Sequence, residues 1–251
     1  MKLALYLPNF RDHVTVQELA DLTDLAEELD FDSVWTLDRI VVPEASDRGE
    51  LQYSFGMMKE FPKQLPVSSH GKWLQGWPLL PWLAARTEKL RIGMSITDTP
   101  YRSPGVFAAE CATIDQLSGG RLNVGIGSGW MPEEFAASSA AEIFPRRHAH
   151  VRETIEICQG IWTNETFEYH GEFADFEPCG FGHQPVQKPH RQSTSAAYGT
   201  RSARPTGWRN TAWRAGSGSR TPRGSSPSGA PPSATSSRSS ASRSTTCRCA
   251  A

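Results

Sequence analysis

The sequence of 251 residues has no run of about 18 apolar residues, the length that a membrane-spanning helix needs. It opens directly into an expected strand, without the basic segment and apolar stretch of a secretory leader. Its five cysteines lack the spacing of a zinc site, and Cys111 and Cys158 fit ordinary positions in a helical core. These absences predict a cytoplasmic protein with no membrane partner and no metal.

The segment 191–251 contains no Val, Ile, Leu, Met or Phe, and no Asp, Glu or Lys. It is a low-complexity tail of Ser, Arg, Ala, Thr, Gly and Pro, and its 10 arginines are balanced by no acidic residue. Such a composition cannot form a hydrophobic core. Residues 1–190 are therefore the expected folding unit, with 16 Lys and Arg against 27 Asp and Glu.

Three interpretations of this tail are open. Its arginines could neutralise nucleic-acid phosphates, but it lacks the folded scaffold that specific recognition needs, so no specific nucleic-acid partner is expected. It could be a disordered linker. We favour translation out of frame, because deleting one cytosine from codons for His-Pro-Pro-Ile-Tyr-Val-Gly-Gly yields codons for His190 to Ala197, and the hidden frame reads as a β-strand.

In the first 190 positions, segments with the apolar spacing of strands alternate with segments that have the apolar spacing of helices. We expect strands over 2–8, 33–37, 90–96 and 121–126, helices over 14–29, 78–86, 104–117 and 147–162, and a small hairpin over 166–176. The long segment 41–77 is expected to be a functional loop over a pocket. Four strand–helix repeats require parallel pairing. The pattern predicts an α/β fold: the first four β/α units of a (β/α)8 TIM barrel, or an open doubly wound sheet.

Gly125, Gly127 and Gly129 alternate where the fourth expected strand leaves its sheet. Bare backbone at that point lets a flat or phosphate-bearing ligand approach main-chain N–H groups. The spacing differs from the dinucleotide-binding fingerprint, and the glycines could also serve only close packing of strand and helix. Because the carboxyl ends of parallel strands share one edge, residues 37–39, 95–97 and 125–130 should lie on one rim.

Short motifs follow in a fixed order along residues 1–190. They include Ser33-Val-Trp-Thr-Leu-Asp-Arg39, Pro100-Tyr-Arg-Ser-Pro104, the block 125–130 with Glu133-Glu-Phe135, and His170-Gly-Glu-Phe173. In their order and spacing the chain resembles the bacterial luciferase-like monooxygenase superfamily, especially the branch of oxidoreductases that use the deazaflavin coenzyme F420. The resemblance implies a TIM barrel whose mouth holds a reduced flavin or deazaflavin against the ends of the early strands.

The resemblance also implies the residues of the site. The expected cofactor-binding residues are Asp38, Ser95, Ile96, Thr97, Gly127, Ser128, Gly129 and Trp130, with a non-prolyl cis peptide at Ser95-Ile96 or beside it. Asp38 and Arg39 are the expected catalytic residues. Many relatives have a proton-relaying histidine where this chain has Arg39, and a guanidinium is a poor acid or base. Arg39 would instead hold an anionic substrate or stabilise negative charge on the reduced ring.

Purely structural alternatives are open for these side chains. Asp38 could cap backbone N–H groups, and Trp130 could pack on its own helix. Glu133 and Glu134 fit the first turn of a helix, where carboxylates interact favourably with the helix dipole.

Two hypotheses about function follow. In the first, the chain is an oxidoreductase acting on a small organic substrate, with F420 as cofactor and FMN as the alternative, and segment 41–77, including His70, shapes the substrate pocket. F420 would imply hydride transfer; FMN would imply monooxygenation and a flavin reductase partner. The resemblance further implies a homo-oligomer. In the second, the chain is a truncated frameshift product without activity, because the later strands of such a barrel are missing.

Overall fold

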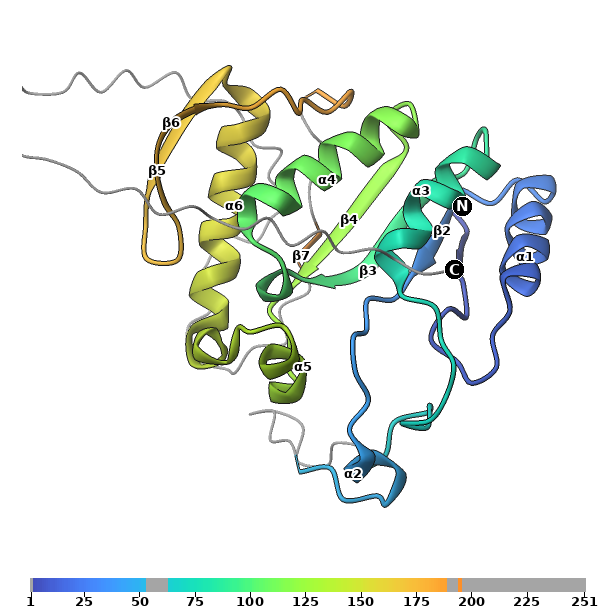
Figure 1. The fold of residues 1–251 in the computed structure, drawn as a ribbon. Helices are drawn as coiled ribbons and strands as arrows, with labels where there is room; N and C mark the ends of the chain where they lie inside the picture. Colours follow the sequence, from blue (N-terminus) through green and yellow to red (C-terminus); the bar gives the residue numbers. More distant parts are fainter. Residues whose placement is uncertain (1, 53–62, 189–193, 196–251) are drawn as a thin grey trace, which may run out of the picture. The chain divides into compact units, whose positions relative to one another are not determined.

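The central feature of the fold is a five-stranded parallel sheet with the order β1-β2-β3-β4-β7 (Figure 1). The structure is a computed structural model that describes residues 2–52, 63–188 and 194–195. These residues belong to one compact unit, residues 1–203; the second unit, 204–251, lies outside the described residues. The strands are β1 (Ala4–Tyr6), β2 (Ser33–Thr36), β3 (Arg91–Asp98), β4 (Leu122–Gly127) and β7 (Thr194–Ser195).

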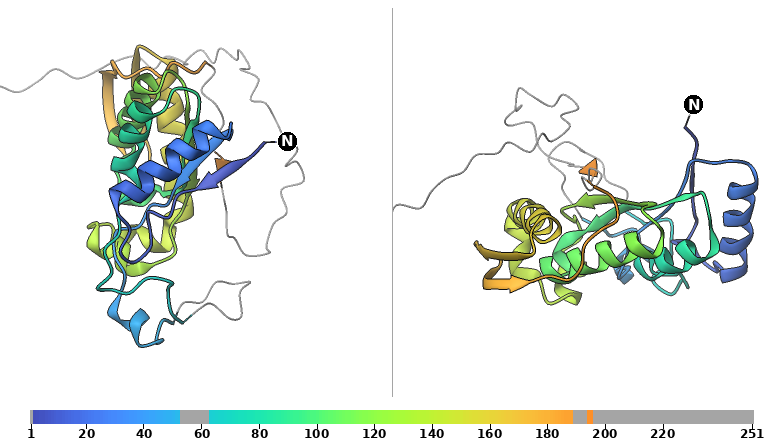
Figure 2. Two further views of the ribbon diagram at one scale, coloured as in Figure 1. Left: turned by 90° about the vertical axis from the view of Figure 1, so that its right-hand side faces the viewer. Right: turned by 90° about the horizontal axis from the view of Figure 1, so that it is seen from above.

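Four long helices alternate with the first four strands, namely α1 (Val16–Glu28), α3 (Gly76–Arg86), α4 (Pro104–Leu117) and α6 (Arg147–Thr163). Helices α3 and α4 lie side by side against β3 and β4 (Figures 1 and 2). The core forms between helices and sheet, where Leu80, Ile92, Met94, Phe107 and Ile157 are fully buried. The parallel α/β fold expected from the alternation is thus confirmed.

Local sequence fixes where these helices begin. Thr15 precedes α1, and its hydroxyl accepts a hydrogen bond from the backbone N–H of Glu18. The backbone N–H of Thr15 in turn donates to the Glu18 carboxylate, which completes a capping box. Pro104 occupies the first position of α4, where its missing N–H costs no helical hydrogen bond. The expected bounds of both helices agree with the structure to within two residues at their starts.

A hairpin follows α6 and packs against it through aromatic side chains. Strands β5 (Thr166–His170) and β6 (Asp175–Gly180) pair antiparallel, as the sequence predicts, although β6 runs further than expected. The buried carboxylate of Glu153 in α6 accepts hydrogen bonds from the backbone N–H groups of residues 172, 173 and 174 in the hairpin turn. This carboxylate fixes the turn to the helix.

Several short elements were not expected from the sequence: α2 (Glu44–Asp47), α5 (Pro132–Ala137), and the 3-10 helices η1 (Thr99–Tyr101) and η2 (Ala141–Arg146). They are too short to show a helical apolar period, so the pattern of the sequence does not reveal them. Helix α2 lies within the long segment 41–77, of which residues 53–62 are outside the described part of the chain. No helix among the described residues is long and apolar enough to cross a membrane.

Two residues of the tail belong to the described part of the chain and pair with the sheet. The backbone of Thr194–Ser195 forms β7, which pairs parallel with Gly125 and Ile126 of β4. The residues of the tail as they stand predict no strand, although the hidden frame over 190–197 reads as one; the described backbone adds β7 to the four expected strands. The reason is that strand pairing uses backbone N–H and C=O groups, which Ser and Thr supply as well as apolar residues do. The rest of the predicted tail, 191–193 and 196–251, lies outside the described residues.

Candidate active site at the carboxyl edge of the sheet

The carboxyl ends of β2, β3 and β4 converge at one edge of the sheet, on the side of α5 in Figure 1. Asp98 ends β3 and pairs in register with Gly127, which ends β4. A Cβ atom on Gly127 would clash with the Ile96 side chain and lie 2.9 Å from Oδ1 of Asp98. The guanidinium of Arg39, just beyond β2, lies 5.0 Å from the ring centroid of Trp130. The expected rim residues from three separate segments therefore lie together.

Asp38 is buried in a network of side chains. Its carboxylate accepts hydrogen bonds from Nη1 of Arg102 at 2.7 Å and from Nε2 of Gln75 at 2.5 Å. The Arg102 guanidinium also lies over the ring of Trp77, 4.9 Å from its centroid. Within the described segments, Asp38 makes no hydrogen bond to a backbone N–H, so the capping alternative is not what the structure has. Asp38 instead ties the end of β2 to the residues that follow η1.

Arg39 forms a second buried ion pair, with Glu134 of α5. The atoms Nη1 and Oε2 are 2.5 Å apart, and the two side chains are 8% and 0% exposed. Glu134 also accepts hydrogen bonds from the backbone N–H of Ile40 and from the Tyr101 hydroxyl. The expectation that Glu134 only occupies a first helical turn is therefore incomplete. An anionic substrate would have to compete with this carboxylate for Arg39, which makes the predicted anion-binding role harder to fulfil.

Asp98 is the third carboxylate at this edge and has a different environment. Its Oδ1 accepts a hydrogen bond from the backbone N–H of Gly129 at 2.9 Å. Burial raises the pKa of Asp98 to about 7; the neighbouring charges of Glu134 and Asp38 raise it too, while Arg39 and the Gly129 bond lower it. Burial also raises the pKa of Glu134, against the opposite effect of Arg39.

The remaining expected cofactor residues line the same edge. The peptide bond between Ser95 and Ile96 is cis, as the resemblance implies, and the Ser95 carbonyl accepts a 3.4 Å hydrogen bond from the hydroxyl of Tyr6. Ser128 is half-buried between Gly127 and Gly129, and Gly129 has a left-handed φ of +72°. All eight expected cofactor residues thus belong to the three converging segments.

Three buried polar atoms at this edge, Oγ1 of Thr97, Oγ1 of Thr99 and Nε of Arg39, have no hydrogen-bond partner in the described part of the protein. Buried donors are normally paired, so such atoms often mark a place where a ligand or water binds. They would suit the polar edge of a flat ring system, whereas the place of a Cβ on Gly127 is filled by Ile96 and Asp98, so this glycine lets β4 pack closely against β3. Within the described residues there is no group of His, Cys, Asp and Glu that could hold a metal ion.

Sequence reasoning missed five polar residues of this edge: Gln75, Asp98, Tyr101, Arg102 and Glu134. A signal for three of them was present, because Asp98, Tyr101 and Arg102 directly follow the expected third strand, where ligand-binding residues of such folds collect. Gln75 is far from any strand end in the sequence, and no local pattern distinguishes it.

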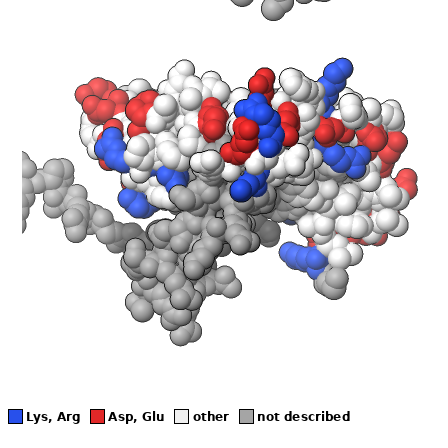
Figure 3. Space-filling model, turned by 90° about the horizontal axis from the view of Figure 1, so that it is seen from below, with Lys and Arg blue, Asp and Glu red and all other residues white. Residues whose placement is uncertain are grey.

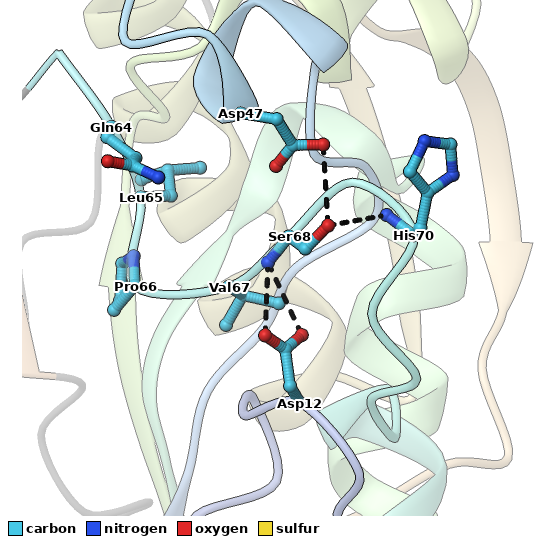
Figure 4. Close-up of a pocket in the computed structure, with 8 residues that line it drawn as sticks. All are labelled: Asp12, Asp47, Gln64, Leu65, Pro66, Val67, Ser68 and His70. Carbon is cyan, nitrogen blue, oxygen red and sulfur yellow. Dashed lines mark hydrogen bonds between the residues drawn. The ribbon is translucent and has the colours of Figure 1, made fainter.

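A pocket is formed largely by the long segment 41–77, which was expected to shape the substrate pocket (Figure 4). It has a volume of about 760 Å³ and is lined by Asp12, Asp47, Gln64, Leu65, Pro66, Val67, Ser68 and His70. The Ser68 backbone N–H donates to Asp12, and its hydroxyl donates to Asp47, so both carboxylates hold the loop together. His70 lines this pocket, which agrees with its expected position, but the position alone assigns no ligand to its ring.

Viewed from below, the coloured surface carries acidic and basic side chains side by side (Figure 3).

Comparisons with known proteins agree with this architecture. The family model described as luciferase-like monooxygenase matches residues 1–220. An FMNH(2)-dependent dimethylsulfone monooxygenase of Pseudomonas putida is 38% identical over 109 residues, which are 43% of this chain and 30% of that protein. An F420-dependent glucose-6-phosphate dehydrogenase of Amycolatopsis mediterranei is 28% identical over 173 residues, 68% of this chain and 45% of that protein.

Two solved structures have the same fold. The monooxygenase RslO1 from Streptomyces bottropensis aligns with a TM-score of 0.57 and 23% identity, covering 76% of this chain and 51% of that one. An F420-dependent secondary alcohol dehydrogenase in complex with an F420-acetone adduct aligns with a TM-score of 0.57 and 19% identity, covering 74% and 49%. The chain spans about half the length of these relatives or less. Because the family model covers most of the sequence, the chain belongs to the luciferase-like monooxygenase family, whose members have the TIM-barrel fold expected from the sequence.

Proposed function

We propose that this chain is an oxidoreductase that binds coenzyme F420 at the carboxyl edge of its sheet and acts on a small organic substrate. FMN is the alternative cofactor. The observation that carries the proposal is the convergence of residues 38–39, 95–98 and 127–130 at one edge, with buried polar atoms that have no hydrogen-bond partner among the described residues. Relatives whose names include F420 and FMNH(2) support this cofactor class without choosing between its members.

The residues at this edge would divide the work of holding the ring. Gly127 and Gly129 would hold the end of β4 close to Ile96 and Phe135, and Trp130 would form an aromatic wall. Thr97 and Arg39 would donate hydrogen bonds from Oγ1 and Nε, two of the buried atoms without a partner among the described residues. When bound, the ring supplies hydride transfer in the case of F420, or oxygen activation in the case of FMN.

The two ion pairs would keep these groups in place. Asp38 holds Arg102 and Gln75, and Arg39 holds Glu134, so the loops after β2, β3 and β4 are linked to one another. Such fixed geometry lowers the entropic cost of ordering loops when a ligand binds.

If FMN is the cofactor, we expect a separate flavin reductase to supply its reduced form.

Binding of each cofactor tests the proposal directly. The protein is titrated with F420 and with FMN, each oxidised and reduced, and binding is followed by cofactor fluorescence and by calorimetry. We expect F420 to bind; binding of FMN without F420 would contradict our preference, and binding of neither would contradict the proposed function. The same result would favour the alternative that the chain lacks activity.

Two glycine-to-alanine variants, one at the carboxyl edge and one in α4, serve as test and control. In Gly127→Ala the new Cβ would clash with Ile96 and approach Asp98, whereas in Gly105→Ala of α4 the new Cβ meets nothing within 4 Å. We expect Gly127→Ala to weaken binding by about tenfold or more, equivalent to about 1.4 kcal/mol, and Gly105→Ala to leave binding unchanged. Equal affinities for the two variants would place the ligand elsewhere.

A further inference from the structure

The charged groups at the carboxyl edge do not balance. Three buried carboxylates, those of Asp38, Asp98 and Glu134, lie near two guanidinium groups. Arg102 pairs with Asp38 and also, at 3.7 Å, with the partly exposed Glu110, and Arg39 pairs with Glu134. Asp98 has no ion-pair partner among the described residues. Fully ionised, the cluster would therefore hold one negative charge without a partner, and burying such a charge is costly.

The titratable and charged groups that act on Asp98 come from three segments. Glu134 comes from α5, Asp38 and Arg39 from the segment after β2, and Tyr101 from η1. The two carboxylates disfavour ionisation of Asp98 and Arg39 favours it. Because Arg39 is already engaged by Glu134 at 2.5 Å, its effect on Asp98 is largely offset. Asp98 is thus the carboxyl group of this cluster best placed to carry an exchangeable proton.

Asp98 acts on one particular segment. Its Oδ1 accepts the hydrogen bond from Gly129 N–H, and on the other side Nε of Arg147 donates to the Gly129 carbonyl at 3.1 Å. A Cβ on Gly129 would lie 2.7 Å from the Phe135 ring. The peptide groups on both sides of this residue are therefore held by charged side chains, and one of these side chains can lose its charge.

We propose that Asp98 is a positioning residue for the segment Gly127–Trp130, which it holds through the Gly129 amide more tightly when ionised than when neutral. A hydrogen bond to an ionised carboxylate is stronger than one to a neutral carboxyl group. Raising the pH through the ionisation of Asp98 should thus tighten this segment. The inference rests on the proposed function only in that the same segment is assigned to the cofactor.

The Gly129 amide itself provides the readout. The chain contains four Ser-Gly pairs, so protein with carbonyl-13C serine and 15N glycine gives few amide signals, and Ser128→Ala identifies that of Gly129. Between pH 5 and 9, in the absence of cofactor, we expect the Gly129 amide proton to move downfield along a single-proton curve with a midpoint of about 7. The Gly119 amide, which donates to the Gln116 carbonyl, is the internal control and should not follow this curve.

Two variants make the test decisive. Asp98→Asn keeps an acceptor for Gly129 but cannot ionise, so the transition should disappear. Glu134→Gln removes a neighbouring negative charge and frees Arg39, so the midpoint should fall. A Gly129 amide that does not titrate, or a transition that persists in Asp98→Asn, would overturn the proposal. Because no cofactor is present, these results are independent of whether F420 or FMN binds.

Discussion

The buried pair of Asp38 and Arg102 provides a sharp test of what holds the carboxyl edge together. Its side chains are 0% and 14% exposed, and the charged atoms are 2.7 Å apart. In Arg102→Met the stem is retained, but Asp38 is left buried with Gln75 as its remaining partner. Removing one partner of a buried pair costs about 3 to 5 kcal/mol, and loss of the stacking on Trp77 adds about 1 kcal/mol.

A surface pair of the same chemistry serves as the control. Arg86 pairs with Asp24 at 2.5 Å and lies over Trp82, but these charged side chains are 34% and 47% exposed. We expect Arg86→Met to change the free energy of unfolding little, because water solvates whichever charge remains. Each substitution removes an arginine that pairs with an aspartate and lies over a tryptophan. The two sites differ in burial and in the additional 3.7 Å ion pair of Arg102 with Glu110.

Urea unfolding, followed by far-UV circular dichroism, measures both costs. The cycle is completed with Asp38→Asn and with the double variant Asp38→Asn/Arg102→Met. We expect the double variant to be more stable than the sum of the single effects by about 2 kcal/mol, since neither charge is then left unpaired. A cost below about 1 kcal/mol for Arg102→Met, or strict additivity, would refute the reasoning.

Three further predictions follow. The folded state holds a proton on Asp98 up to a pH of about 7, whereas the unfolded chain releases it near the ordinary value of 3.8. Stability should therefore fall as pH rises between these values, by up to about 4 kcal/mol, and the difference between wild type and Asp98→Asn in urea melts should report this slope; parallel pH profiles would contradict it. Glu153→Gln loses the charged acceptor of three backbone N–H groups, so it should lower the free energy of unfolding by about 1 to 3 kcal/mol and speed hydrogen exchange in the hairpin turn. Glu156→Gln is the control, because the Glu156 side chain pairs with Tyr169 on an exposed surface and its loss should change both quantities little. Gly93→Ala would place a Cβ 2.5 Å from the Trp35 ring, so its melting temperature should drop well below that of Gly105→Ala; equal melting temperatures would show that the Trp35 ring can move aside.

The sequence predicts the regular part of this molecule well, for physical reasons. Long helices such as α4 and buried strands such as β4 have periodic apolar residues, and their expected bounds agree with the structure within about two residues at most ends. The register of the sheet then places residues 38, 97 and 127 near one another. Their proximity follows from parallel topology alone.

The side-chain partners at the edge could not be predicted in the same way. Arg39 and Glu134 are 95 positions apart, and Asp38 and Arg102 are 64 apart, so no local pattern links them. The choice of partner depends on where η1 and α5 direct their side chains, and both elements are too short to have a periodic signature. The residues of β7 as they stand have no strand pattern, because its pairing depends on backbone hydrogen bonds rather than on side-chain type; the hidden frame over 190–197 alone predicts a strand there.

Asp38 and Arg39 are adjacent, yet they bind oppositely charged partners that follow different strands. Deleting one residue just before them would bring Arg39 to the place of Asp38, opposite Arg102, and would leave Glu134 facing Ile40. The two ion pairs would be replaced by repulsion between Arg39 and Arg102 and by a Glu134 carboxylate without a guanidinium partner. The length of the chain between β2 and Arg39 is thus constrained more tightly than its composition, and length variation in this fold is better accommodated beyond Ile40.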